Sequence, residues 1–304
     1  MSTKRINSDL DVESKFLKIF LSQEKVPNKE NYSDEIWPKI SVVMPSFNHE
    51  KYIERSILSV INQGYPNLEF IIIDGKSTDT TCLIIEKYKK YISFFRSKED
   101  KGQSDALNYG FSKSTGDIFA WLNSDDVYLP GALFSAAKAF QNNKNARIVY
   151  GDWWSIDSLD NVLNLNYAFD FSVNHFIYEG FHLNSQAMFW RKSVHKNFGE
   201  FDIYLHKTMD YDMILRFGMN EGSSKFYRLP VVLACFRRHI EQKSQDENDP
   251  TILEEHKKTA KKHNIYNMKY GIFKPIYRLF YRFRRAWWYM KRGGLDFTLK
   301  QIYK

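Results

Sequence analysis

The sequence predicts an α/β protein built on a mostly parallel central sheet flanked by helices. Two patterns support this fold class. Over the first half of the chain, short apolar runs of strand length alternate with stretches in which apolar residues recur at helical spacing. Continuous apolar runs such as 68–73 are also typical of strands that are buried on both faces, as parallel strands usually are.

The expected elements of the first half follow in a regular order. Residues 39–44 read as a strand, and residues 50–63 then carry apolar side chains at helical spacing. The next elements are a strand over 68–73, a helix over 78–91, a short strand near 92–95, a helix over 104–112, a strand over 118–122 and a helix over 130–141 with Pro130 at or near its first position. Parallel crossovers bring the carboxyl ends of strands to one edge, where we expect a ligand to bind.

The second half has shorter elements of mixed type, which are expected to extend the same sheet. They are strands over 147–150, 153–156, 162–167, 186–190 and 229–236, a helix over 209–218, a charged helix over 252–263 and an amphipathic helix over 273–292. The chain thus divides into an N-terminal polar segment with a short helix and a linker (1–38), a main domain (39–245) and a C-terminal helical tail that is basic and aromatic (246–304).

Composition allows a substantial core, because 43% of the residues are hydrophobic. The formal net charge is +8, with seven Lys or Arg and no acidic residue between Lys274 and Arg292. Cys82 and Cys235 lie in apolar runs and are expected to be buried free thiols, which favours a reducing, cytoplasmic compartment. The polar N-terminus is not typical of a signal peptide, and no apolar window approaches the ~20 residues of a transmembrane helix.

Four polar motifs follow the ends of expected strands. They are Pro45-Ser46-Phe47-Asn48, Asp74-Gly75-Lys76-Ser77-Thr78-Asp79, the segment Asp-Lys-Gly-Gln-Ser-Asp-Ala-Leu-Asn over 100–108, and Trp121-Leu122-Asn123-Ser124-Asp125-Asp126. The adjacent carboxylates Asp125 and Asp126 are costly at the end of an apolar strand unless they are paired or bind a metal, and Mn²⁺ or Mg²⁺ suits such oxygen ligands. The alternative is that one of these acids caps the turn before Pro130.

In this order and near this spacing, the four motifs resemble those of the family 2 glycosyltransferases, which have the GT-A fold. The resemblance covers about residues 39–240. It implies an inverting transfer of a sugar from a nucleotide-diphosphate donor, commonly UDP-linked, to an acceptor hydroxyl. The alternative function is a non-catalytic nucleotide-sugar or glycan binding protein on the same fold. A dehydrogenase is excluded because Gly-x-Gly-x-x-Gly does not follow the first strand.

The resemblance also implies roles for individual residues at the donor site. Pro45, Phe47 and Asp74 would surround the nucleoside, although an Asp-Gly pair is also common in turns. Asp125 would be the principal metal ligand. Asn123 stands where the family usually has Asp; its amide can still offer a carbonyl oxygen or bond a ribose hydroxyl. The other expected donor-site residues are Asn48, Lys101, Gly102, Asp105, Ser124 and Asp126.

The catalytic base and the acceptor site are expected in the second half. Asp210 matches the family's base at a helix start, with Asp212 as the alternative; both acids could instead only favour the helix N-terminus. In Phe236-Arg237-Arg238-His239, His239 would complete the metal site or touch the diphosphate, and Arg237 would contact phosphate, unless the segment is a surface basic cluster. The expected acceptor-pocket residues, which could equally be packing residues, are Trp153, His182 and Gln186.

The tail predicts a membrane contact. Ile276, Phe280, Phe283, Trp287 and Met290 form one helical stripe, while the arginines fall largely on other faces. This pattern is typical of a helix lying on an anionic membrane. The alternative is that the stripe docks on the domain. We therefore expect a cytoplasmic protein, peripheral on the inner face of the membrane, acting on a glycan or lipid-linked acceptor in surface polysaccharide or glycolipid assembly, and no nucleic-acid partner.

Overall fold

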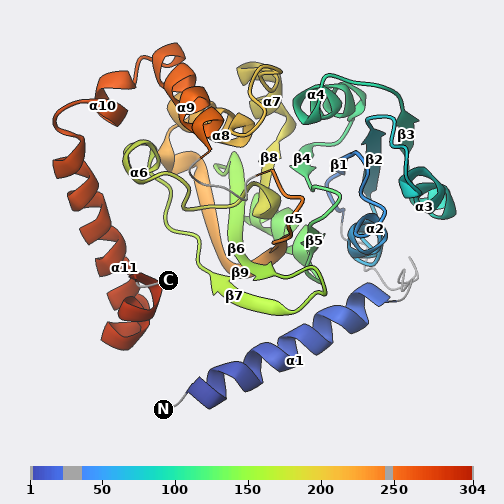
Figure 1. Cartoon of the computed structure of the whole chain (residues 1–304), viewed down its shortest axis with the longest axis horizontal. Coiled ribbons are helices and arrows are strands. Elements are labelled where there is room, and N and C mark those ends of the chain that lie inside the picture. Colours follow the sequence, from blue (N-terminus) through green and yellow to red (C-terminus); the bar gives the residue numbers. More distant parts are fainter. Residues whose placement is uncertain (1–2, 23–35, 244–248, 303–304) are drawn as a thin grey trace.

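A computed structural model of the chain describes residues 3–22, 36–243 and 249–302. Its centre is one nine-stranded sheet with the order β3-β2-β1-β4-β8-β6-β9-β5, and β7 pairs with β6 (Figure 1). The strands are β1 (Ile40–Ser46), β2 (Leu68–Asp74), β3 (Phe94–Ser97), β4 (Ile118–Trp121), β5 (Val127–Tyr128), β6 (Ile148–Ile156), β7 (Val162–Asn166), β8 (Met188–Arg191) and β9 (Phe226–Arg237).

The helices cover both faces and the margins of this sheet. They are α1 (Thr3–Ser22), α2 (Ile53–Ile61), α3 (Thr81–Lys87), α4 (Gln103–Lys113), α5 (Ala132–Asn142), α6 (Val173–Glu179), α7 (Lys192–Phe198), α8 (Met209–Glu221), α9 (Pro250–Lys262), α10 (Tyr266–Tyr270) and α11 (Lys274–Ile302). Within these described residues, no helix combines the length and apolar character needed to cross a membrane.

The expected α/β fold class is confirmed, and the parallel part lies where the sequence placed it. Strands β3, β2, β1 and β4 are all parallel neighbours, whereas β8 joins β4 and β6 in antiparallel fashion. The second half extends the same sheet, as expected, and β6 and β9 pair in parallel over most of their length. The site-bearing ends of β1, β2 and β4 therefore lie at one edge.

Two apolar layers hold the sheet. One layer packs α2 and α5 against residues such as Val42 and Phe70, and the other packs α4 and α8 against residues such as Val43 and Ile71. The alternation of neighbours between layers is the period-2 pattern of a strand buried on both faces. This burial explains why the parallel strands appear in the sequence as continuous apolar runs.

Several element boundaries differ from the sequence expectation. Residues 147–150 and 153–156 belong to one strand, because Gly151 lets β9 pass close: a Cβ there would lie 2.6 Å from Leu233 Cδ1. The helix expected over 78–91 is α3 followed by a 3₁₀ turn, Lys89–Tyr91. Pro130 precedes α5, whose N-cap is Gly131. The short helix expected near 16–21 is the 20-residue α1, and α6 and α7 were not expected.

The C-terminal helix α11 lies beside α6, at the left of Figure 1. Its inner side is made by Tyr281 and Tyr289, which are buried. Three arginines, Arg278, Arg282 and Arg285, converge on Glu179 at the end of α6. The Glu179 side chain is only 3% exposed, so the contact with α11 encloses it.

The expected aromatic stripe of this helix does not face the domain. Ile276, Phe280, Phe283 and Trp287 are each more than half exposed, and Met290 is half-buried. The alternative in which this stripe docks on the domain is therefore wrong. The helix docks through a different face, which carries Tyr281 and Tyr289, and leaves the stripe in solvent.

Candidate functional site

The first two motifs are joined to each other at the carboxyl ends of β1 and β2. Ser46 and Asp74 are partners in the register of these strands, and Gly75 N donates to Ser46 O (2.8 Å). Asn48, with φ of 52°, accepts from Thr78 N through Oδ1 (2.8 Å) and donates from its own N to Ser77 Oγ (2.8 Å). Asn tolerates this left-handed conformation better than most residues. Asn48 therefore holds the two loops together rather than projecting toward a ligand.

Asp74 is buried in hydrogen bonds of its own loop. Its carboxylate accepts from Ser77 N (2.9 Å), from the hydroxyls of Ser77 and Ser97, and from Cys82 Sγ (3.3 Å). It is 0% exposed. These contacts show Asp74 organising the loop, which differs from the direct nucleoside contact that the resemblance implies. Cys82, expected to be buried, is half-exposed at this position, while Cys235 is buried; both are free thiols.

Asp100 is the more open carboxylate next to this loop. It is half-buried, its Oδ2 would lie 3.1 Å from a Cβ at Gly75, and burial raises its pKa. Phe47 lies beside the same Cβ position, with its Cδ2 at 3.3 Å, and is 58% exposed. An exposed aromatic ring beside a carboxylate suits a nucleoside, whose base can stack and whose ribose can donate hydrogen bonds. Asp100 stands in the third motif but was not singled out there.

The third motif forms the start of α4. Gly102 is the N-cap, with φ of 106°, a conformation that favours glycine. Its N donates to Asp100 Oδ1 (2.8 Å), and Asp105 Oδ2 accepts from Lys101 N (3.0 Å). The Lys101 side chain is exposed. Asp105 thus satisfies a backbone N–H before α4 and adds negative charge where the helix dipole favours it.

The fourth motif is a tight turn whose residues have different surroundings. Asp126 is 0% exposed and accepts from Arg237 N (2.8 Å) and from Asn123 Nδ2 (3.3 Å). Burial, followed by the charge of Asp125, raises its pKa well above the usual range. Asp125 has a side chain that is 13% exposed, and its Oδ2 lies 2.9 Å from His239 Nε2. Asp125 is therefore the member of this pair that can reach a ligand.

The amide of Asn123 is committed to this turn. Its Oδ1 accepts from Trp121 Nε1 (2.6 Å) and from Gln103 Nε2 (2.7 Å), and its Nδ2 donates to Asp126. Its backbone N donates to Gln186 Oε1 (3.0 Å). An aspartate at this position would place a second carboxylate against the buried Asp126. These hydrogen bonds explain why asparagine stands at this position. Gln186 stabilises the same turn through the backbone of Asn123.

Two histidines lie next to Asp125. His239 is 8% exposed and its ring is 4.7 Å from that of Tyr52. His49 Nδ1 is 2.6 Å from Ser124 Oγ, and its ring lies 6.3 Å from that of His239. His49 was missed in the sequence, although it directly follows the Pro-Ser-Phe-Asn motif. Although burial alone would raise the pKa of Asp125, the hydrogen bond from His239 and the positive potential of both rings lower it.

The donors at this turn fit a divalent cation that is shared with a ligand. Asp125 offers a carboxylate that stays ionised, and His239 offers a ring nitrogen, a combination that Mn²⁺ accepts. Among the described residues, no three His, Cys, Asp or Glu side chains are grouped to hold a metal by themselves. A cation here would therefore complete its shell with phosphate oxygens and water, as Mg²⁺ and Mn²⁺ usually do at nucleotide sites.

The start of α8 brings the second pair of acids. Asp210 is half-buried, and within the described part of the chain its carboxylate accepts from Tyr211 N (2.8 Å). Burial raises its pKa to about 6. Asp212 is 0% exposed and pairs with Arg216 Nε (2.8 Å) and His263 Nε2 (2.7 Å). Although burial opposes its ionisation, these partners lower its pKa to about 2. Asp210 therefore has the properties of a proton acceptor, and Asp212 those of a structural acid.

Packing ties the start of α8 to the start of α4. Ser104 Oγ donates to Leu205 O (3.3 Å), and Asn108 exchanges two hydrogen bonds with the backbone of Phe201. A Cβ at Gly102 would lie 3.8 Å from His206 Nδ1. Because Gln103 in turn contacts Asn123, the segment before Asp210 and the Asp125 turn share α4 as a common support.

Three expected site residues have surroundings that differ from the expected contacts. Arg237 is 0% exposed, with Nε donating to Asp125 O (2.7 Å) and NH1 to Asp157 O (2.9 Å), so it supports the turn from inside and does not face a phosphate. His182 is buried and stacks on Phe171. Trp153 is half-buried and packs against both apolar layers. The surroundings of His182 and Trp153 are those of packing residues, which was the alternative to a place in the acceptor pocket.

Comparison with known proteins gives the same family as the motifs. The model of "Glycosyl transferase family 2" matches residues 41–199, just over half of the chain. An uncharacterized glycosyltransferase of Rickettsia typhi is 30% identical over 193 residues, covering 59% of this chain and 58% of that protein. An uncharacterized glycosyltransferase of Haemophilus influenzae is 40% identical over 92 residues, covering 29% of this chain and 37% of that protein. The chain thus spans less than three fifths of the length of either relative.

Solved structures show the same fold at low sequence identity. S. aureus TarS 1-349 in complex with UDP-GlcNAc has a TM-score of 0.63 and 17% identity, covering 84% of this chain and 74% of that chain. Mannosyltransferase PcManGT from Pyrobaculum calidifontis, in complex with GDP-Man and Mn²⁺, has a TM-score of 0.57 and 14% identity, covering 97% and 86%. The expected GT-A fold is confirmed.

Proposed function

Because this chain belongs to glycosyl transferase family 2, we propose that it moves a sugar from a nucleotide-diphosphate donor to an acceptor hydroxyl with inversion at the anomeric carbon. A UDP-linked hexose is the donor we favour, since the TarS structure with this fold holds UDP-GlcNAc. The nucleoside would lie between the exposed Phe47 ring and the Asp100 carboxylate. Lys101 and the start of α4 would lie beside the diphosphate.

The bond changes follow from the position of Asp210. Its carboxylate takes the proton of the acceptor hydroxyl while the acceptor oxygen forms a bond to the anomeric carbon. The bond from that carbon to the diphosphate oxygen breaks, and its electron pair leaves with the nucleoside diphosphate. Attack from the face opposite the leaving group inverts the configuration. A pKa of about 6 lets Asp210 be ionised at neutral pH and still be a stronger base than an ordinary aspartate.

Asp125 and His239 would hold the divalent cation, Mn²⁺ or Mg²⁺. When bound, such a cation offsets the negative charge that develops on the departing diphosphate. The residues behind these ligands, Asp126, Asn123 and Arg237, keep the turn in place through buried hydrogen bonds. That PcManGT is in complex with both GDP-Man and Mn²⁺ supports the assignment.

The observation that carries the proposal is the different surroundings of two site carboxylates: Asp125 Oδ2 lies 2.9 Å from His239 Nε2, whereas Asp210 stands at the start of α8 and accepts from Tyr211 N (2.8 Å). The first suits a cation ligand and the second suits a base. The direct experiment is to incubate the protein with UDP-, GDP- and dTDP-sugars, with and without Mn²⁺, and to measure release of the nucleoside diphosphate. Failure of every donor to react or to raise the melting temperature would contradict the proposal.

A second candidate is a binding protein without activity, and Asn123 is the feature that raises it. In that case a nucleotide-sugar would stabilise the protein against heat but no diphosphate would be released in the same incubation, with or without a glycan acceptor. The hydrogen bonds of the Asn123 amide favour the enzyme over the binding protein. They give the asparagine a role in the turn, so its presence does not imply that a metal site has been lost.

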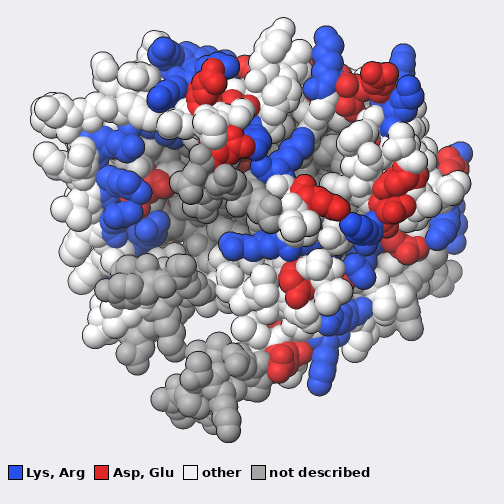
Figure 2. Space-filling model, viewed as in Figure 1, with Lys and Arg blue, Asp and Glu red and all other residues white. Residues whose placement is uncertain are grey.

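We also propose that α11 places the enzyme on an anionic membrane, where a lipid-linked acceptor for surface polysaccharide or glycolipid assembly would be found. Lys and Arg side chains gather over this part of the molecule (left in Figure 2). The exposed Phe280, Phe283 and Trp287 can enter the interface, and each Lys or Arg near the surface contributes about 1 kcal/mol of attraction to acidic lipid.

Vesicle sedimentation tests this placement. Phe280→Ser with Phe283→Ser and Trp287→Ser should reduce binding to phosphatidylglycerol vesicles at least tenfold, because burying one such side chain contributes about 1.5–3 kcal/mol. The matched control replaces Val12, Phe16 and Ile19, an exposed apolar stripe on α1, with serine. Equal binding of the tail variant and the wild type would remove the membrane proposal, and leave the transferase proposal untouched.

A further inference from the structure

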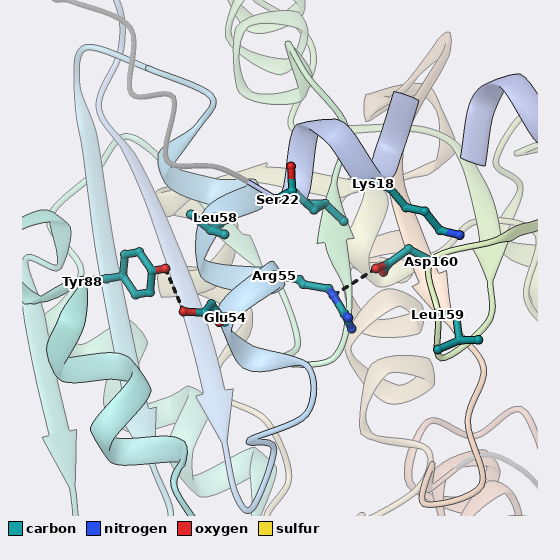
Figure 3. A pocket seen from close by; sticks show the side chains of 9 residues that line it. Lys18, Ser22, Glu54, Arg55, Leu58, Tyr88, Leu159 and Asp160 are labelled. Carbon is teal, nitrogen blue, oxygen red and sulfur yellow. Dashed lines mark hydrogen bonds and ion pairs between the residues drawn. The ribbon is translucent and has the colours of Figure 1, made fainter. Parts of the chain in front are cut away.

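A chain of ion pairs runs from the surface to the turn that carries Asp125. Asp160 lies between two arginines: its Oδ2 is 3.0 Å from Arg55 Nε, and its Oδ1 is 2.6 Å from Arg237 NH2. Figure 3 shows the outer pair, with Arg55 reaching across a pocket from α2 toward Asp160. Asp160 is 3% exposed and Arg237 is 0% exposed, so the inner pair is buried.

Two other groups of Arg237 bond to the site, while its NH1 donates to Asp157 O (2.9 Å). Its Nε donates to the backbone oxygen of Asp125 (2.7 Å), and its backbone N donates to Asp126 Oδ1 (2.8 Å). A guanidinium is planar and presents its donors in fixed directions. The Asp160 carboxylate, paired with NH2, and the Asp157 carbonyl, bonded to NH1, together set where the Nε donor points, and hence where the Asp125 carbonyl lies.

The local backbone shows that Asp160 is held in this place. It sits in the turn between β6 and β7 with φ of 63°, a left-handed conformation uncommon for residues other than glycine, asparagine and aspartate. Asp157 supports the turn by accepting from Leu159 N (2.8 Å) and Asn161 N (2.9 Å). From α1, Lys18 Nζ donates to Asn161 Oδ1 (2.6 Å). The turn is thus held by Lys18 of α1, Arg55 of α2 and Arg237 at the end of β9, and the Asp160 carboxylate faces inward.

We propose that Asp160 is a positioning residue for the cation site: by orienting Arg237, it sets the Asp125–Asp126 turn in the conformation that accepts the metal. This inference rests on the proposed cation role of Asp125. Groups behind metal ligands that orient them commonly change metal affinity by about 10- to 100-fold when mutated. Removal of the Asp160 charge also leaves the buried Arg237 without its acidic partner.

The test is a titration with Mn²⁺ in the presence of UDP, in which the electron paramagnetic resonance signal of free Mn²⁺ reports binding. Asp160→Asn should weaken Mn²⁺ binding at least tenfold. The matched control is Glu69→Gln, which neutralises another acid in a buried network with Lys39, Ser41 and Thr115, at the amino ends of the strands. The control should lose thermal stability but bind Mn²⁺ as the wild type does.

A second variant keeps the test decisive if Asp160→Asn does not fold. Arg55 is 38% exposed, so Arg55→Gln should fold, and it removes only the outer cation. We expect Mn²⁺ binding two- to fivefold weaker, as befits a half-exposed pair. Wild-type affinity in folded Asp160→Asn, or in Arg55→Gln where the former is unfolded, would overturn the inference. Absence of Mn²⁺ binding in the wild type would instead overturn the cation role of Asp125.

Discussion

The turn of Asp125 and Asp126 and the start of α8 with Asp210 and Asp212 each carry two carboxylates. In each pair, one acid is fully buried in hydrogen bonds and ion pairs, and the other is more open. The two open acids differ in their neighbours. Asp125 faces His239 and keeps a low pKa, whereas Asp210 lies in a desolvated place and has a pKa of about 6. Similar sequence patterns therefore produce different surroundings, which under our proposal suit a cation ligand in one case and a base in the other.

Replacing the base should have the largest effect. Asp210→Asn is expected to lower kcat about 10²- to 10⁴-fold, the usual contribution of a positioned base. The folded-state pKa of about 6 lies above the ~3.9 of an unfolded aspartate, so the ionised carboxylate costs stability as pH rises through 4 to 6. The same variant should thus melt at a higher temperature than the wild type at pH 7.5. Calorimetry and a nucleotide-release assay check both parts.

Asp212→Asn distinguishes the two acids of that pair. This variant should melt earlier, because Arg216 and His263 lose a buried partner, while the folded fraction keeps most of its activity. If Asp212→Asn instead abolished turnover without loss of stability, the assignments of base and structural acid would have to be exchanged.

The cation pair comes next. Asp125→Ala should lower activity on the order of a hundredfold and reduce its dependence on Mn²⁺, because the leaving diphosphate loses its charge balance. Asp126→Asn should stay within about tenfold of the wild type, since burial already favours the protonated, uncharged form of this side chain. Rates measured over a Mn²⁺ series check this pair. Greater loss in Asp126→Asn than in Asp125→Ala would contradict it.

The pH profile gives an effect of intermediate size. Because Asp210 must be ionised to accept a proton, kcat/KM should fall about tenfold per pH unit below about pH 6 and level off above it. The residual activity of Asp210→Asn should not show this decrease in kcat/KM below about pH 6. A wild-type profile that is flat down to pH 5 would exclude Asp210 as the titrating base.

The smallest expected change comes from restoring the family's acid. Asn123→Asp places a carboxylate beside the buried Asp126 and removes the amide N–H that Asp126 accepts. Denaturation in urea should show a loss of about 1–3 kcal/mol in the free energy of unfolding. A variant that is as stable as the wild type would show that the turn accommodates either residue, and that the Asn123 amide is not needed for the stability of the turn.

Much of the fold was predictable because parallel strands are buried on both faces. The continuous apolar runs at 40–46 and 68–74 and the polar residues that end them depend only on local sequence. The resemblance then supplied the family, which the comparisons confirm. The join of 147–150 with 153–156 was missed, because the contacts that make this strand continuous lie far along the chain: β9 passes close to Gly151, and Arg228, 76 residues away, pairs with Asp152.

The site was less predictable than the fold, because its contacts join residues that are far apart in the sequence. Whether a polar residue faces a ligand depends on partners far along the chain. Arg237 is enclosed by the turn after β6, and Asp74 is enclosed by Ser97 from the next strand. Asp100 could have been found, since it stands in the quoted third motif, but its open carboxylate becomes evident only beside Phe47 and Gly75.

The convergence of Arg278, Arg282 and Arg285 on Glu179 has a geometric consequence for the proposed placement of α11 on a bilayer. A helix docked on the domain by these pairs and by the buried Tyr281 and Tyr289 differs from a loose tether. Under that proposal, an aromatic stripe inserted among lipid headgroups would also fix the tilt of the whole domain. Encounters with a proposed acceptor in the bilayer would then occur by lateral, two-dimensional diffusion, with the orientation of the domain already fixed.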